Sequence, residues 1–251
     1  MHRFFLPVES ITPERVVFPA PIAHQIRHVL RLKEGMDVEV LDNQGNMLQV
    51  RLEEISESKV VGKIIARSQP QDEPAVSLTV CVSLTQREKF ELILQKNVEV
   101  GTSCILPFIS RYSLVREKTI ETKRRQRWED ILREAAEQSG RVRIPTLGEV
   151  CNLPRMVAHC KAEYDVCLAA WEGEHGTSLQ QALQTQRSAG KNLRSVAIFI
   201  GPEGGFAQQE VELFEQAGVK CISLGKRILR METAAIVAPA LILYELGQMG
   251  L

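Results

Sequence analysis

Two glycine-bearing turns near the C-terminus constrain the fold of this chain more than any other feature. The first is Gly-Pro-Glu-Gly-Gly at 201–205, and the second is Leu-Gly-Lys-Arg-Ile-Leu-Arg at 224–230. Each follows a short apolar run and leads into a helical pattern. Turns of this kind after neighbouring parallel strands converge at the C-terminal edge of a sheet. The sequence therefore predicts a ligand site there, where glycines expose bare backbone.

Other apolar runs predict a parallel sheet covered on both faces. The runs are 78–82, 104–109, 166–170, 196–200 and 221–224. Continuous apolar runs of this length are typical of strands that are buried on both sides. Stretches with helical periodicity alternate with them, for example around Phe90 and Trp128. This alternation indicates an α/β domain.

The first 70 residues show a different pattern, in which short strands predominate. The expected strands are 15–18, 37–41, 47–52 and 59–65, with a short helix at 23–32 and a hairpin turn at 42–46. A small antiparallel barrel fits this order. The polar, proline-flanked segment 68–74 is typical of a linker. We therefore expect one domain over residues 1–70 and a second over residues 75–251.

Composition and charge exclude several classes of protein. The 31 basic and 31 acidic residues give no net charge, so nucleic-acid binding would depend on local basic patches. Six cysteines lack the spacing of a zinc site, so we expect buried, reduced thiols and no metal. Pro7 and Glu9 interrupt any signal peptide. The most apolar stretch, 234–243, is short for a membrane span, which takes about 20 residues. We expect a cytoplasmic protein without membrane contact.

Neither glycine turn matches a common nucleotide-binding motif. No Gly-Lys-Ser/Thr follows the first turn, and Gly-x-Gly-x-x-Gly is missing, which counts against a nucleotide-dependent oxidoreductase. A plain structural turn is the alternative at 201–205. Glu203 favours a site, because an acid after a buried strand is placed to meet a cation, a ribose or a catalytic partner. In the second turn, Glu232 and Thr233 either cap the next helix or belong to the site.

The two turns in full, Ile-Gly-Pro-Glu-Gly-Gly-Phe and Leu-Gly-Lys-Arg-Ile-Leu-Arg-Met-Glu-Thr-Ala, resemble the signature of the ribosomal RNA small subunit methyltransferase E family. Segments 24–31, 95–101 and 134–145 resemble further blocks of that family, with Val100 in place of the usual leucine. The resemblance spans nearly the whole chain. It implies methylation of uridine N3 in small-subunit ribosomal RNA with S-adenosylmethionine. The alternative is a non-catalytic ribosome-binding module that keeps the fold.

The same resemblance implies an architecture and partners. Members of the family have a PUA-like RNA-binding barrel, followed by a SPOUT methyltransferase domain whose C-terminal segment forms a trefoil knot. They act as homodimers on small-subunit ribosomal RNA or the 30S particle. A knot is an exception to a strong topological rule, and periodicity alone would not predict one.

The resemblance further implies that the loops 169–172, 201–205 and 224–230 line the cofactor pocket. The expected cofactor-binding residues are Ala170, Glu172, Gly201, Pro202, Glu203, Gly204, Leu224, Gly225, Ile228, Leu229 and Arg230. Ile228 and Leu229 are alternatively ordinary core residues. We expect Arg230 to be catalytic, because a guanidinium stabilises a uracil that has lost its N3 proton; the alternative is a salt bridge to Glu232. Glu203 is expected to accept that proton or to orient the cofactor, with water as a competing acceptor.

RNA contacts are predicted on two surfaces. The expected RNA-binding residues are Arg3, His24, His28 and Arg31 in the first domain, with Arg124 and Arg125 in the second. His24 and His28 lie four residues apart on one helical face, and without a nearby carboxylate they form a poor metal site. Arg124 and Arg125 belong to the basic run 116–127. That run either binds phosphates or is a solvated helix face.

Overall fold

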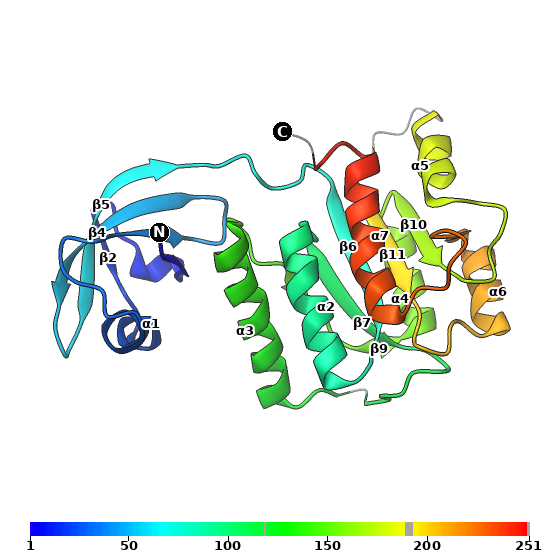
Figure 1. Cartoon of the computed structure of the whole chain (residues 1–251), viewed down its shortest axis with the longest axis horizontal. Helices are drawn as coiled ribbons and strands as arrows, with labels where there is room; N and C mark the ends of the chain where they lie inside the picture. The colour runs from blue at the N-terminus through cyan, green and yellow to red at the C-terminus, as the bar shows by residue number, and fades with distance from the viewer. Residues whose placement is uncertain (118, 189–192, 250–251) are drawn as a thin grey trace. The chain divides into compact units, whose positions relative to one another are not determined.

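The computed structural model describes residues 1–117, 119–188 and 193–249. The chain divides into two compact units, which are coloured along the sequence in Figure 1. Unit 1 comprises residues 1–73 and 133–144, and unit 2 comprises residues 74–132 and 145–251. Unit 1 thus adds a short later segment to the stretch that we expected to form a domain. An RNA-binding role for residues 1–70 stays a prediction.

Unit 1 is built on a five-stranded sheet in the order β1-β3-β4-β5-β2. Its strands are β1 (Arg3–Phe5), β2 (Arg15–Val17), β3 (Asp37–Leu41), β4 (Met47–Ile55) and β5 (Val60–Ser68). The four predicted strands are confirmed. The expectation of a purely antiparallel barrel is wrong in one respect, because β1 pairs with β3 in parallel. Among the described residues, no pairing joins the outer strands β1 and β2.

The helix expected at 23–32 forms earlier and in two pieces. It consists of α1 (Ala20–His24), which continues into a π-helical turn over Gln25–Val29, and a short 3-10 turn (Val8–Ser10) precedes β2. Ile26 of this segment is fully buried with Phe4 and Val38 in the core of the unit. Alternate residues of β3 and β4 point into the same core, which fixes the register of the sheet.

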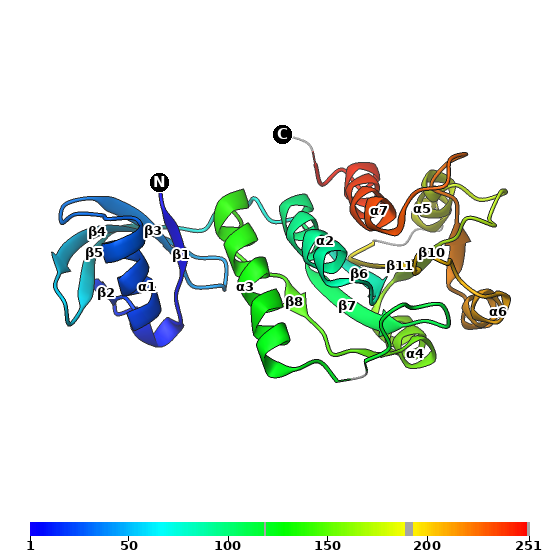
Figure 2. The same cartoon turned by 60° about the horizontal axis from the view of Figure 1, so that its bottom comes forward.

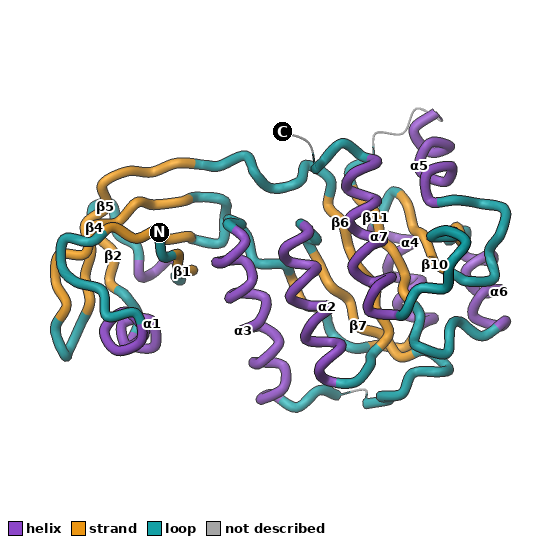
Figure 3. The backbone as a smooth tube through the Cα atoms, viewed as in Figure 1, coloured by secondary structure: helices purple, strands orange, loops and turns teal. Residues whose placement is uncertain are grey.

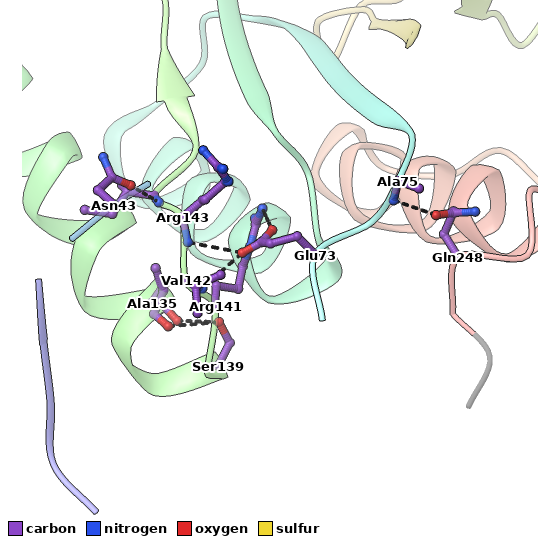
Figure 4. A network of polar contacts seen from close by, with 11 residues as sticks. Asn43, Glu73, Ala75, Ala135, Ser139, Arg141, Val142, Arg143 and Gln248 are labelled. Carbon is purple, nitrogen blue, oxygen red and sulfur yellow. Dashed lines mark hydrogen bonds and ion pairs between the residues drawn. The ribbon is translucent and has the colours of Figure 1, made fainter. Parts of the chain in front are cut away.

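The later segment of unit 1 begins within α3 (Thr122–Ser139) and ends at residue 144. Glu73 binds it through three groups: the Arg141 guanidinium, with Nη2 at 2.6 Å, and the backbone N–H groups of Val142 and Arg143, each at 3.1 Å (Figure 4). Asn43 Oδ1 accepts a further bond from Ile144 N at 2.7 Å. The two segments of unit 1 are therefore tied together where each of them ends.

Unit 2 contains a parallel sheet in the order β12-β10-β11-β6-β7-β8, with β9 also beside β7. Its strands are β6 (Ser77–Ser83), β7 (Cys104–Ile109), β8 (Thr146–Leu147), β9 (Cys151–Asn152), β10 (Val166–Ala170), β11 (Ser195–Ile200) and β12 (Lys220–Ile222). Every pairing between these described strands is parallel. The predicted α/β class is confirmed, and each of the five apolar runs forms a strand.

Helices cover both faces of this sheet. They are α2 (Arg87–Val100), α4 (Leu153–Glu163), α5 (Leu179–Ser188), α6 (Gln208–Ala217) and α7 (Met231–Glu245), together with the first part of α3. In Figure 2, α2 and α7 lie on one side of the sheet, while α4 and α6 lie on the other. The loops that join strands to helices are drawn in teal in Figure 3. These loops carry the site.

The core between the sheet and the α4 and α6 pair is rich in aromatic rings and thiols. Phe108, Phe199, Phe206 and Phe214 contact one another with ring centroids 4.9 to 6.4 Å apart. All six cysteines are free, and four of them are buried, as expected for reduced thiols. The rings hold strand β11, the turn after it and helix α6 in one packed layer, so the position of that turn is fixed by the core.

Candidate functional site

Three adjacent strands deliver three loops to one edge of the sheet in unit 2. Strand β10 lies between β11 and β12, and all three run in the same direction. Their carboxyl ends therefore meet, and each is followed at once by one of the loops singled out from the sequence. The loop beginning at Trp171 follows β10, the turn 201–205 follows β11, and the segment 223–230 follows β12.

The first glycine turn is closed by its own backbone and anchored by the core. Gly205 has a φ of +71° and donates to Pro202 O at 2.9 Å, a conformation that favours glycine. The next residue, Phe206, is buried among the aromatic rings. A Cβ on Gly201 would lie 3.1 Å from the Phe206 ring. A side chain at position 201 would therefore crowd that ring, and glycine suits this close approach.

The second turn is open and leads directly into α7. Gly225 has a φ of +122°, and a Cβ built on it meets no atom within 4 Å. Ile228 is 87% exposed, so the core alternative does not hold for this residue, while Leu229 is half-buried. Arg230 occupies the N-cap position of α7, and no side chain caps that helix. Glu232 lies in the first turn of this helix, where an acid suits the helix dipole, and it also lines the cavity described below.

The third loop runs against the second turn. Trp171 N donates to Ile222 O at 3.1 Å, and Ser223 N donates to Thr177 O at 2.9 Å. Ser178 and Ser223 also form a parallel bridge. These backbone bonds hold residues 171–178 beside the end of β12, and so place Glu172 at the same sheet edge as the two glycine turns.

A cavity of about 760 Å³ lies between these loops, within the usual range of about 300–1,000 Å³ for small-molecule sites. The structure brings together all eleven residues expected to bind a cofactor, since each lines this cavity: Ala170, Glu172, Gly201, Pro202, Glu203, Gly204, Leu224, Gly225, Ile228, Leu229 and Arg230. Its walls also include residues that sequence reasoning did not assign to the site, among them Lys89, His175 and Ser223.

Glu203 is held by two donors from the segment that follows β6. Its Oε1 accepts a hydrogen bond from Thr85 Oγ1 at 2.6 Å and another from Lys89 Nζ at 2.9 Å. Partial burial acts to raise the pKa of Glu203, but these donors outweigh it, and the pKa lies below its usual value. The hydrogen bond to Glu203 in turn raises the pKa of Lys89. Both groups are therefore charged at neutral pH.

The order of the strands could have predicted that Lys89 and Thr85 lie at this edge of the sheet. Strand β6 is the neighbour of β11 on the side away from β10, so the residues after β6 reach the same edge of the sheet. Ligands bind at the carboxyl ends of parallel strands, so this rule applies to Lys89 and Thr85 as well. They lack a glycine motif, and only the strand order reveals their position.

Two charged side chains in the cavity keep hydrogen-bonding capacity to spare. Glu232 Oε2 is buried and has no hydrogen-bond partner among the described residues, and Lys89 Nζ lies 3.9 Å from it. Arg230 is exposed and makes no side-chain hydrogen bond or ion pair within the described part of the chain. The alternative reading of Arg230 as a salt-bridge partner of Glu232 is therefore not what the structure contains.

Three of the arginines expected to bind RNA already have protein partners. Arg3 forms an ion pair with Glu39. Arg124 pairs with Glu117 at 2.9 Å and lies over the Trp128 ring. Arg125 pairs with Glu129 and Glu149 and donates to Leu147 O. These contacts give each arginine a structural role, and RNA contact by them stays a prediction. Position 118 of the basic run lies outside the described residues.

The remaining predicted RNA-binding residues lie together on the surface of unit 1. His24, His28 and Arg31 are all exposed, and the two imidazole rings lie 4.7 Å apart, centroid to centroid. Arg31 has a φ of +52°, which turns the chain directly after the helical segment. This basic group is free to meet a ligand, although nothing in its geometry identifies one.

Two further findings hold for the residues that the structure describes. No cluster of three or more His, Cys, Asp or Glu residues among them could hold a metal ion. In the same residues, no helix combines the length and the apolar character needed to cross a bilayer.

Comparisons with known proteins show which family this chain belongs to. The family described as RNA methyltransferase domain matches residues 71–243. The chain is 33% identical to ribosomal RNA small subunit methyltransferase E of Bacillus subtilis over 241 residues, which are 95% of this chain and 91% of the relative. It is 28% identical to the protein of that name from Buchnera aphidicola subsp. Schizaphis graminum, over 98% of this chain and 96% of the other.

A solved structure of a protein of that name has a similar fold. The crystal structure of a ribosomal RNA small subunit methyltransferase E from Neisseria gonorrhoeae, bound to S-adenosyl methionine, superposes with a TM-score of 0.83 at 27% identity and covers 97% of both chains. With matches of this length and with the paired glycine turns in place, the chain belongs to the ribosomal RNA small subunit methyltransferase E family.

Proposed function

We propose that this chain is an S-adenosylmethionine-dependent methyltransferase that acts on N3 of a uridine in small-subunit ribosomal RNA. The observation that carries the proposal is the convergence of three strand-to-helix loops on one cavity that also holds an arginine without a side-chain partner in the described part of the chain. The relatives named above are ribosomal RNA methyltransferases, and the Neisseria protein binds this cofactor. Uridine N3 as the acceptor atom comes from the family resemblance of the sequence.

The cavity fits the cofactor in size and in the chemistry of its walls. The turn at Gly225 offers bare backbone with open space in front of it, and Ala170 and Gly201 add further small residues. The buried, unpartnered oxygen of Glu232 requires a hydrogen-bond donor that the described protein does not supply. When bound, S-adenosylmethionine supplies a methyl group that its sulfonium has already activated. The protein's contribution is then geometry and electrostatics.

Arg230 is the residue best placed to stabilise negative charge on the acceptor base. A uridine that loses its N3 proton becomes an anion, which a preorganised cation stabilises. Arg230 lines the cavity, starts helix α7, and has no carboxylate partner among the described side chains. Its guanidinium is therefore available to the base and is held where the second turn ends.

Glu203 fits an orienting role better than that of a proton acceptor. Its carboxylate is already engaged by Thr85 and Lys89, and its pKa lies below the usual value. A lowered pKa makes a carboxylate a weaker base at neutral pH. We therefore assign Glu203 a role in positioning the ligand and Lys89. Water or the unpaired oxygen of Glu232 is then the acceptor of the N3 proton.

We further propose the finer architecture that the family resemblance implies. The bonds of 171–178 to the end of β12, followed by the passage of the chain to α7 beside α2, support a C-terminal trefoil knot of the SPOUT type. The curved five-stranded sheet of unit 1, with its exposed basic helix, supports a PUA-like RNA-binding domain. A homodimer that acts in the cytoplasm on ribosomal RNA or the 30S particle completes the proposal.

The test is a methylation assay with the purified protein. Small-subunit ribosomal RNA and 30S particles from cells that lack the gene are incubated with protein and isotopically labelled cofactor, and nucleosides are identified by mass spectrometry. We expect labelled N3-methyluridine from the native protein and none from Arg230→Ala. The variant should keep its fold and most of its RNA affinity. Tight RNA binding without any calorimetric heat from the cofactor would support the non-catalytic alternative.

A further inference from the structure

Tyr112 lies at the rim of the cavity, in the loop that follows β7. The side chain is 48% exposed. If Gly204 carried a Cβ, that atom would lie 3.1 Å from Tyr112 Cβ, 3.6 Å from its Cγ and 3.8 Å from its Cδ2. The tyrosine ring therefore borders the turn 201–205, which forms one wall of the cavity. Tyr112 is not itself among the residues that line the cavity.

The loop around Tyr112 is held firmly by buried polar contacts. Ser113 Oγ lies 2.7 Å from Ser83 Oγ and accepts a hydrogen bond from Ser110 N at 2.8 Å. Glu210 of α6 accepts from Ser110 Oγ and from Arg111 N, each at 2.9 Å. Ser110 and Ser113 are both buried. The residues on either side of Tyr112 are thus fixed, and the ring is presented from a defined position.

An exposed aromatic ring is unusual in this chain. All eight phenylalanines are buried, and Tyr112 and Tyr244 are the only exposed phenylalanine, tyrosine or tryptophan side chains among the described residues. No described residue forms a hydrogen bond with the Tyr112 hydroxyl. Packing of the protein therefore does not account for this ring, which offers a flat apolar face beside a site for an RNA substrate.

We infer that Tyr112 is a stacking residue for RNA, holding the base next to the target nucleotide at the mouth of the cavity. The inference rests on the proposed function. An enzyme that modifies a base edge must draw that base out of its stack, and aromatic side chains compensate for the lost stacking. Because Tyr112 borders the cavity without lining it, its partner is a neighbouring base, while the target base enters between the loops.

The experiment uses a short RNA of the target region with 2-aminopurine beside the target uridine. Stacking on Tyr112 quenches 2-aminopurine fluorescence when the native protein binds. We expect Tyr112→Ala and Tyr112→Leu to lose the quenching and to bind RNA at least about 5-fold more weakly, given the size of one base–aromatic stack. Tyr112→Phe should behave like the native protein, because it keeps the ring.

Two controls separate stacking from other effects. Leu114→Ala removes another exposed apolar side chain of the same loop, with no aromatic face, and should leave quenching unchanged. Cofactor affinity, measured by calorimetry, should be equal in all variants. If the native protein methylates the RNA while Tyr112→Ala and Tyr112→Leu keep native quenching and affinity, the stacking role is refuted and the proposed function stands. If the native protein methylates no RNA, the proposed function itself fails.

Discussion

Glu73 provides the strongest test of how unit 1 is held together. Its carboxylate faces Arg141 and two backbone N–H groups in the segment 141–143 (Figure 4). The side chains of Glu73 and Arg141 are 18% and 10% exposed. Removing one partner of a buried ion pair costs about 3–5 kcal/mol. We expect Glu73→Ala to lower the free energy of unfolding of unit 1 by about 3 kcal/mol, at the low end because water reaches part of the pair.

The assay must report on unit 1 alone. Both tryptophans and all three tyrosines lie in unit 2, so intrinsic fluorescence follows unit 2. Amide hydrogen exchange, read by mass spectrometry on peptides from β3 to β5 and from 133–144, follows unit 1. A loss of about 3 kcal/mol corresponds to exchange about 100-fold faster for amides that open with the whole unit.

Matched variants define the result that would refute this reasoning. Glu73→Gln keeps one acceptor oxygen and should lose about half as much stability. Glu14→Ala removes an exposed carboxylate that makes no ion pair or side-chain hydrogen bond within the described chain, and it should change exchange very little. If Glu73→Ala shifts the unit 1 peptides by less than about 0.5 kcal/mol, Glu73 does not join the two segments.

Three further predictions concern the site and its surroundings. Lys89→Met removes a donor to Glu203 and should weaken cofactor binding about 5-fold by calorimetry, with the affinity largely restored in Lys89→Arg. Burial raises the pKa of Cys104 to about 11, so this thiol should react slowly with a disulfide reagent at pH 8 in the folded protein, while all six thiols react after unfolding. Arg31→Glu should weaken RNA binding at low salt without changing cofactor affinity; equal RNA affinity would show that this face of unit 1 does not contact RNA.

Local sequence signals predicted the strands that have enough residues to show a pattern. β3 and β7 match their expected bounds, because each is a complete apolar or alternating run. β8 and β9 went unpredicted, since two residues carry no measurable periodicity. The three-residue β1 was also missed, whereas β2 and β12, which are equally short, were found from the runs 15–18 and 221–224. Local sequence patterns also could not predict that residues 133–144 belong to unit 1. Its helix is continuous, and only contacts distant in sequence, such as that between Glu137 and Phe5 N, reveal the division.

Some residues of the site could be predicted from local sequence motifs, and others only from tertiary structure. Nine of the eleven residues that we expected to bind the cofactor lie in the two glycine turns, and a turn that needs a positive φ or bare backbone leaves a mark in the sequence. Ala170 and Glu172 were expected only from the family resemblance. Lys89 occupies an ordinary helix position, and Tyr112 an ordinary loop position. Lys89 follows β6 and Tyr112 follows β7. Each reaches the region of the cavity because these strands lie next to β11 and β6 in the strand order of the sheet. That order is set by tertiary packing, which no single segment encodes.

Glu203 shows why an acid in a glycine-rich turn need not be the base of the reaction. Since its pKa is lowered from the ordinary value of 4.5 in the folded chain, its stabilising contribution is present above about pH 4.5 and is lost as the pH falls through the lowered pKa. At neutral pH the carboxylate is ionised and already bound by Lys89 and Thr85, so accepting a proton would weaken both bonds. The open acceptor of the cavity is instead Glu232 Oε2. The glycines around Glu203 thus mark the turn that places it against Lys89, while the mechanism that we propose assigns the chemistry to Arg230 and to Glu232 Oε2 or water as the proton acceptor.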